Sequence, residues 1–271
     1  MARGDWKRPS EFPLEKGKRR IRLDISYDGA NFSGWQRQKG RRTVQQTIEE
    51  ALAVMLKEEI HVHGSGRTDA KVHALAQVAH FDTVNQSVPS EVFTLALNQR
   101  LPHDIRLTHS KEVTEKFHAR FTAIEREYRY MVKLISDYTP FDRNRVARIR
   151  RFAPLELLNA YAACCLGTHN FTTFGSSADQ SHSKIRDLYM SEFFWETSEW
   201  GGKILVYKVS GNAFLMHQVR SMVGTMLQLG EQEALPAEFA RRLAAQDRLM
   251  ALRTAAPEGL YLYRIAYDQD E

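Results

Sequence analysis

The sequence predicts an α+β fold made of two ferredoxin-like split-βαβ halves, each with the element order β-α-β-β-α-β. Strand-like alternation and helix-like periodicity occur in this order twice along the chain. A length of 271 residues and a hydrophobic content of 43% are sufficient to bury a large core. We therefore expect the halves to join into one wide mixed or antiparallel sheet, with helices on one side and a cleft on the other.

The first half begins with residues 21–27 (IRLDISY), whose apolar and polar residues alternate as in a half-buried strand. A glycine-containing loop follows, and Thr43 with Gln46 has the pattern of a capping box. Apolar residues at helical spacing then predict a helix that extends to about Met55. The rest of this half is expected to contain strands at 60–63 and 77–82, a short helix at 91–98 and a strand at 104–110.

The second half repeats this order. Residues 126–135 are rich in Tyr and Val and predict a strand, and a helix over 154–166 is expected to end at Gly167. The remaining elements are strands at 185–196 and 203–210, helices at 214–229 and from about Pro236, and a strand at 260–267. With the division placed near residues 111–124, the chain consists of a basic, flexible tail over 1–20, an N-terminal half over 21–111 and a C-terminal half over 112–271.

Composition excludes disordered, collagen-like and disulfide-rich classes. No apolar run is long enough to cross a membrane, and the N-terminus lacks the apolar region of a signal peptide. We therefore expect no membrane partner and a cytoplasmic location. The two cysteines, Cys164 and Cys165, are adjacent, a spacing at which they rarely pair, and this usage fits a reducing compartment.

The positive charge is concentrated in a few segments. Residues 1–20 carry a net charge of +4, so they account for most of the +5 of the whole chain. Two further clusters are mostly arginine: residues 37–42 (RQKGRR) and residues 143–151 (RNRVARIRR). Arginine suits bidentate contacts with phosphate, but a charged run is equally typical of a solvated face, and each cluster alone leaves both interpretations open.

Residues 64–74 (GSGRTDAKVHA) are the most distinctive segment. Gly64 and Gly66 allow unusual backbone angles or a close approach to a ligand, and Arg67 and Asp69 follow two residues apart. The arginine favours the ionised form of the neighbouring carboxylate, which could then act as a nucleophile, a base or a metal ligand. A turn stabilised by an ion pair would explain the sequence Arg67-Thr68-Asp69 equally well, so the spacing alone assigns no catalytic role.

Six ordered segments, taken together, resemble the tRNA pseudouridine synthase A family. The resemblance spans residues 21–267, which is nearly everything outside the basic tail. The matching segments are YDGANFSGWQRQ (27–38), GRTDA with VHA and QVAHF (66–81), NQRLPHDI (98–105), FHARFTA with EYRY (117–130), FLMHQVRSMVGT (214–225) and APEGLYL (256–262).

The resemblance implies an isomerase that converts uridine to pseudouridine at positions 38, 39 and 40 of the tRNA anticodon stem-loop. It implies tRNA as the partner, no cofactor and no metal, a homodimer, and a target base that is flipped out of its helix. It also implies that the cleft beside the predicted sheet binds RNA. The cleft should recognise mainly the shape of the RNA and its phosphate groups.

Residue roles follow from the matching motifs. The resemblance implies that Asp69 is the nucleophile, that Arg67 helps to hold the flipped base out of the helix, that Tyr128 stacks on the target uracil and that Arg220 pairs with the catalytic carboxylate. Without the resemblance, Tyr128 is an ordinary strand aromatic and Arg220 a residue beside a helix core. The residues expected to contact tRNA are Arg67, Lys71, Leu75, Ala76, Gln77, Phe117, His118, Ala119, Arg120 and Phe121.

Lys71 departs from the family pattern, which has glycine at this position. A positive φ angle here would strain a lysine, whereas an ordinary φ would let Lys71 add a cation near the RNA path. We expect the second situation.

Two other classes of protein fit part of the sequence. A metal-dependent hydrolase could use the imidazoles and the carboxylate that lie close together in sequence, namely His61, His63, Asp69, His73 and His80. A tRNA-binding protein without catalytic activity would use the same basic clusters. Metal analysis and an Asp69→Asn variant discriminate these classes from an isomerase.

Overall fold

The computed structural model describes residues 12–268, so the first part of the predicted basic tail, residues 1–11, lies outside the described residues. The described chain contains ten strands and five α-helices with both parallel and antiparallel pairing, which confirms the α+β class with a mixed sheet. By contacts the chain forms two compact units. The first unit extends to Ile124 and resumes at Leu262, and the second covers Glu125–Tyr261. The sequence placed a single division, near residues 111–124.

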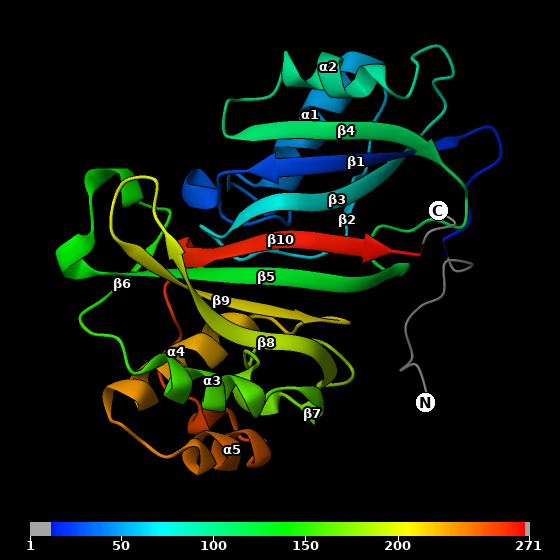
Figure 1. Ribbon diagram of the computed structural model, residues 1–271. Helices are drawn as coiled ribbons and strands as arrows, with labels where there is room; N and C mark the ends of the chain where they lie inside the picture. Colours follow the sequence, from blue (N-terminus) through cyan, green and yellow to red (C-terminus); the bar gives the residue numbers. More distant parts are fainter. Residues whose placement is uncertain (1–11, 269–271) are drawn as a thin grey trace. The chain divides into compact units, whose positions relative to one another are not determined.

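The first unit has the predicted β-α-β-β-α-β order (Figure 1). Its elements are β1 (Arg19–Tyr27), α1 (Val44–Leu56), β2 (His63–Gly64), β3 (His73–Thr83), α2 (Val92–Asn98) and β4 (Ile105–Val113). The strand order is β4-β1-β3-β10, with β2 also paired to β3, and β10 (Leu260–Tyr267) brings the end of the chain back to this unit. All three pairings of β1, β2, β3 and β4 with one another are antiparallel.

Strand β1 shows why this sheet forms. Ile21, Leu23 and Ile25 point to one face and are completely buried, as the period of two along a strand requires. Arg20 and Arg22 point to the other face, where Arg20 is also buried because its guanidinium group binds the Asp82 carboxylate at 2.7 Å. The predicted tail therefore ends before Arg19, and its last two residues are part of the fold.

Two local expectations for this unit are wrong. Residues 60–62 are not a strand, and β2 is only two residues long, although Ile60 and Val62 are buried. Helix α1 begins where expected, but the side chain of Thr43 makes no capping hydrogen bond, and its hydroxyl is buried without a partner. The apolar face of α1 is therefore the main cause of this helix, and the capping box does not form.

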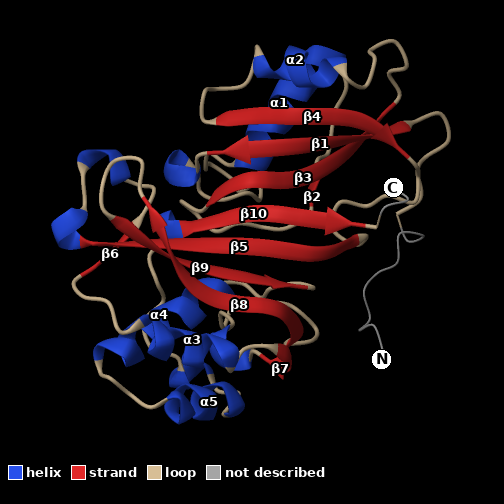
Figure 2. Cartoon of the chain, viewed as in Figure 1, coloured by secondary structure: helices blue, strands red, loops and turns tan. Residues whose placement is uncertain are grey.

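The second unit contains β5 (Ala123–Leu134), β6 (Ala147–Ile149), α3 (Leu155–Ala163), β7 (Gly167–Asn170), β8 (Ile185–Thr197), β9 (Lys203–Gly211), α4 (Gln218–Glu231) and α5 (Pro236–Ala244). Its strand order is β5-β9-β8-β7, and the short strand β6 pairs in parallel with β5. The three helices of this unit pack against one another, and α3 also packs against β8 (Figure 2).

Helix boundaries differ from prediction in this unit. Helix α3 ends at Ala163, and Gly167, expected to end that helix, starts β7 with a φ angle of 84°. Helix α4 begins at Gln218, four residues later than predicted, because His217 adopts a φ angle of 64° that stops the helix from extending backwards. No helix in the described part of the chain combines the length and apolar character needed to cross a membrane.

Candidate active site

The GSGRTDA segment of the first unit forms a loop between β2 and β3 whose start is fixed by hydrogen bonds. The Ser65 amide donates to the Val78 carbonyl at 2.8 Å. The Gln77 side chain donates to the Gly66 carbonyl at 2.8 Å and is completely buried. Gln77, expected to contact tRNA, therefore positions this loop and does not face the solvent.

A second loop, residues 27–35, fixes the centre of the same segment. The hydroxyls of Tyr27 and Thr68 lie 2.7 Å apart, and the Trp35 amide donates to the Thr68 carbonyl at 3.1 Å. A methyl group added at Gly29 would lie 2.0 Å from the Val72 carbonyl oxygen, so only glycine fits this contact. The YDG…GW and GRTDA motifs thus occur together because one supports the backbone of the other.

This support leaves the charged side chains of the loop accessible. Arg67 is exposed and Asp69 is half-buried, whereas Thr68 between them is buried. The Val72 amide donates to the Asp69 carbonyl at 3.2 Å, which closes a turn at the carboxylate. A rigid backbone that presents a reachable carboxylate is the arrangement that a nucleophile or general base requires.

The expectation for Lys71 is wrong. Its φ angle is 65°, so the position does need the left-handed conformation that glycine adopts at little cost. The backbone stays there because the Lys71 amide donates to the Phe32 carbonyl at 3.1 Å. The side chain is exposed, so Lys71 adds a surface cation to a strained backbone.

We expect Lys71→Gly to raise the free energy of unfolding by up to about 1 kcal/mol, because the left-handed strain is removed while part of the gain is offset by chain entropy. Denaturant titration measures the change. Lys71→Ala is the matched control, since it removes the same charge and keeps the strain. Equal stability of the two variants would contradict the prediction.

The segment FHARF, expected to contact tRNA, is mostly internal. Phe117, His118 and Ala119 are buried, whereas Arg120 is exposed and Phe121 is half-buried. Buried side chains cannot reach RNA in this conformation, so the first three residues act as a support for the last two. Phe121 stacks on Phe12, with ring centroids 5.2 Å apart.

Two buried histidines hold this segment through its backbone. The Ala119 amide donates to Nδ1 of His80 at 3.2 Å, and the Arg120 amide donates to Nδ1 of His118 at 3.1 Å. Both nitrogen atoms can accept only while they are unprotonated. In the sequence, His80 fits either a metal ligand or a polar or RNA-contacting residue with its hydrogen bonds satisfied, and the structure shows it accepting from the Ala119 amide. The sequence feature that indicates this supporting role is a histidine in each of two matching motifs, His80 in QVAHF and His118 in FHARF.

The histidine cluster predicts a loss of stability in acid. Burial, together with the positive charges of His63, Arg20 and Arg120, lowers the pKa of His118 to about 4, and burial also lowers the pKa of His80. Below pH 6.5 the unfolded chain binds protons that the folded chain excludes. The free energy of unfolding should therefore fall by up to about 1.4 kcal/mol per pH unit for each histidine between pH 6.5 and 4.

Denaturant titration from pH 7 to 5 checks this slope. His118→Asn is the informative variant, because the amide oxygen still accepts a hydrogen bond but does not titrate. Its slope should be shallower than that of the wild type, and an identical slope would show that His118 does not control it.

The second unit carries Tyr128 and Arg220. Tyr128 lies on β5, is 8% exposed and contacts the edge of Phe214 with ring centroids 5.1 Å apart. Arg220 lies on the first turns of α4, and its Nε donates to the Ala255 carbonyl at 2.9 Å. The neighbouring Ala256 carbonyl accepts from the Tyr130 hydroxyl at 2.7 Å. Residues 255–256 therefore connect α4 with the part of β5 that carries Tyr128.

The remaining candidates are on β3. Leu75 is 46% exposed and Ala76 is half-buried, so both are reachable from solvent. The proposed metal ligands are not gathered into one site: within residues 12–268, no group of three or more His, Cys, Asp or Glu side chains is arranged to hold a metal ion. His73, for example, accepts from the Gly29 amide at 3.1 Å and so supports the 27–35 loop.

Comparison with known proteins identifies the family. The family model described as tRNA pseudouridine synthase matches residues 25–122 and 162–268. A protein of Bacillus pumilus named tRNA pseudouridine synthase A is 40% identical over 251 residues, covering 92% of this chain and 99% of its own. Its namesake in Treponema denticola is 39% identical over 262 residues, covering 95% of this chain and 96% of its own.

The chain belongs to the tRNA pseudouridine synthase family, and it is therefore an isomerase that acts on tRNA. Among solved structures, a chain of a Cbf5-Nop10-Gar1 complex gives a TM-score of 0.34 at 12% identity, covering 92% of this chain and 60% of that one. That likeness is too weak to add to the assignment.

Proposed function

We propose that this enzyme converts uridine to pseudouridine at positions 38, 39 and 40 of the tRNA anticodon stem-loop, with Asp69 as the nucleophile and the target base flipped out of the RNA helix. The observation that carries the proposal is the family match over both units, combined with a reachable Asp69 carboxylate on a loop of fixed backbone.

The reaction breaks the N1–C1′ bond and forms a C5–C1′ bond. The hydrogen at C5 leaves as a proton and N1 gains a proton, so the isomerisation involves no net hydrolysis or redox change and needs no cofactor. An ionised Asp69 could attack C1′, attack C6 or remove a sugar proton to give a glycal. Each route requires the detached uracil to remain in place and away from water.

The other candidate residues have distinct proposed roles. Tyr128 offers a ring face on which the flipped uracil stacks and a hydroxyl that can pass a proton. Arg220 is proposed to pair with the catalytic carboxylate. Arg67, which is exposed, would fill the space that the flipped base leaves. Leu75, Arg120 and Phe121 are accessible and are proposed to contact the RNA.

We further propose that the enzyme acts as a homodimer in the cytoplasm. One subunit would hold the body of the tRNA while the other modifies the anticodon stem-loop. Two free thiols, Cys164 and Cys165, are compatible with a reducing compartment.

Tritium release from an unmodified tRNA transcript labelled at C5 of uridine tests the function, because the C5 hydrogen is lost only when pseudouridine forms. We expect release from transcripts with uridine at position 38, 39 or 40, and none when all three are cytidine. Folded protein that binds the transcript without release above background would favour the tRNA-binding protein without catalytic activity.

A further inference from the structure

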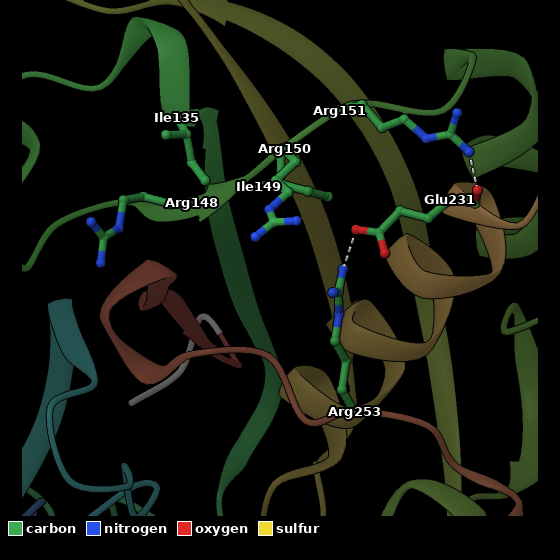
Figure 3. A pocket seen from close by; sticks show the side chains of 7 residues that line it. All are labelled: Ile135, Arg148, Ile149, Arg150, Arg151, Glu231 and Arg253. Carbon is green, nitrogen blue, oxygen red and sulfur yellow. Dashed lines mark hydrogen bonds and ion pairs between the residues drawn. The ribbon is translucent and has the colours of Figure 1, made fainter.

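Three arginines of residues 143–151, namely Arg148, Arg150 and Arg151, line a hollow in the second unit (Figure 3). Strand β6 places Ala147 and Ile149 inward and Arg148 outward, as the period of two along a strand requires. The chain then continues with Arg150 and Arg151, both exposed. The hollow has a volume of about 500 Å³ and is also lined by Arg253 and Glu231.

The charges in this hollow are not balanced. Glu231 is its one carboxylate, and it forms an ion pair with Arg253 at 2.7 Å. Arg151 donates to the backbone carbonyl of Glu231, which leaves its charge uncompensated. Within residues 12–268, Arg148 and Arg150 form no ion pair, and Figure 3 shows neither guanidinium group bonded to another residue that lines the hollow.

Unpaired arginines that line one hollow repel one another, and arginine cannot relieve the repulsion by losing its proton. An arrangement of this kind is suited to an anionic ligand with several charges. Arg148 also lies against the ring of Tyr138, at 5.1 Å from its centroid, which limits the mobility of the side chain. The planar edge of a guanidinium group fixed in this way can bind a phosphate through two parallel hydrogen bonds.

The hollow is connected to Arg220 through a short, fixed segment. Arg253 lies two residues before Ala255, so the Cα atoms of Arg253 and Ala255 are at most about 7 Å apart. The Ala255 carbonyl accepts a hydrogen bond from Nε of Arg220. A methyl group at Gly224 of α4 would lie 2.0 Å from the Arg253 carbonyl oxygen. This close contact holds the segment against the helix that carries Arg220.

We propose that this hollow binds phosphates of the tRNA backbone and so anchors the substrate near Arg220. The inference rests on the proposed function, since it names the substrate that reaches the same segment. A long polyanion explains why the charges extend along residues 143–151, because successive phosphates can meet successive arginines. These contacts add affinity and carry no sequence preference.

The test uses Arg148→Gln/Arg150→Gln, which removes two charges and no ion pair. Binding of an unmodified tRNA transcript is measured in the Asp69→Asn background, so that turnover does not interfere. We expect the dissociation constant to rise about tenfold at 0.1 M salt, and the slope of log affinity against log salt to fall by about 2. In the active background, KM for tRNA should rise in proportion and kcat should stay unchanged.

Lys16→Gln/Lys203→Gln is the matched control, because it removes the same number of charges from exposed positions outside the hollow and also breaks no ion pair within the described part of the chain. Circular dichroism establishes that both double variants are folded. If the hollow variant binds tRNA with the same affinity and salt slope as the control, the hollow is not an RNA surface, and an acidic protein becomes the better candidate occupant. If the wild-type enzyme releases no tritium above background, the proposed function is wrong. The binding measurement would still decide whether the hollow binds RNA.

Discussion

Asp69→Asn is expected to lower the rate of pseudouridine formation by at least about 10³-fold, because an amide is neither a nucleophile nor a base at neutral pH. The shape of the side chain is almost unchanged. The turn at this position is closed by the backbone bond between Val72 and Asp69, which the substitution retains. Stability and tRNA affinity should therefore remain close to those of the wild type.

Single-turnover tritium release with saturating enzyme separates chemistry from binding, and a filter-binding assay measures affinity for the same transcript. Asp137→Asn is a suitable control, since Asp137 is exposed and its carboxylate accepts from the neighbouring Ser136 hydroxyl at 3.0 Å. A rate within tenfold of the wild type would show that another group forms or assists the covalent step. Loss of tRNA binding would point to a structural role for the carboxylate.

The sequence predicts the parts of this fold that depend on short-range patterns. Strand β1 and helix α1 were predicted from periodicity, because each buries one regular face. The start of α4 was not predicted correctly. Apolar residues before Gln218 continue the helical spacing, but His217 adopts a left-handed backbone conformation, so the helix starts after it. Strand β6 was also missed: three residues among five arginines show no apolar period, and their pairing partner lies fifteen residues earlier on β5.

The candidate site illustrates the same limit. The motifs pointed to Arg67 and Asp69, and the structure gives both accessible side chains on a supported loop. The motifs could not distinguish a residue that faces solvent from one that supports the loop, because burial depends on distant segments. Gln77 and His118 belong to the second kind: each uses its side chain to hold a neighbouring backbone group.

Lys71 shows why a departure from a family pattern is hard to interpret without a structure. From the sequence alone, Lys71 could have either a positive φ angle or an ordinary negative one. The contact between the Lys71 amide and the Phe32 carbonyl decides the matter, and Phe32 is separated from it by 39 positions. The strain is then a property of the tertiary fold.

The largest effect on stability is expected at Lys133, which forms a completely buried ion pair with Asp142 in the second unit. The two groups are 2.8 Å apart, and the same carboxylate oxygen accepts from the Thr139 amide at 2.7 Å. Burial alone would raise the pKa of Asp142, but the bonds from Lys133 and Thr139 lower it below its ordinary value. The buried carboxylate is thus kept ionised by a small number of partners.

Lys133→Met should lower the free energy of unfolding by about 3–5 kcal/mol, because the substitution leaves this buried carboxylate without its counter-charge. Denaturant titration measures the loss, and Lys203→Met, at an exposed lysine on β9, is the control.

The pKa of Asp142 should rise in the Lys133→Met variant. Its deficit relative to the wild type should therefore be largest near pH 7 and shrink as the pH falls toward 5 and the carboxyl group takes up a proton. A deficit that is independent of pH would mean that lost packing, and not the unpaired charge, causes the instability. Since Asp142 precedes β6 closely, loosening this pair should also weaken tRNA binding if Arg148 and Arg150 hold the RNA as proposed.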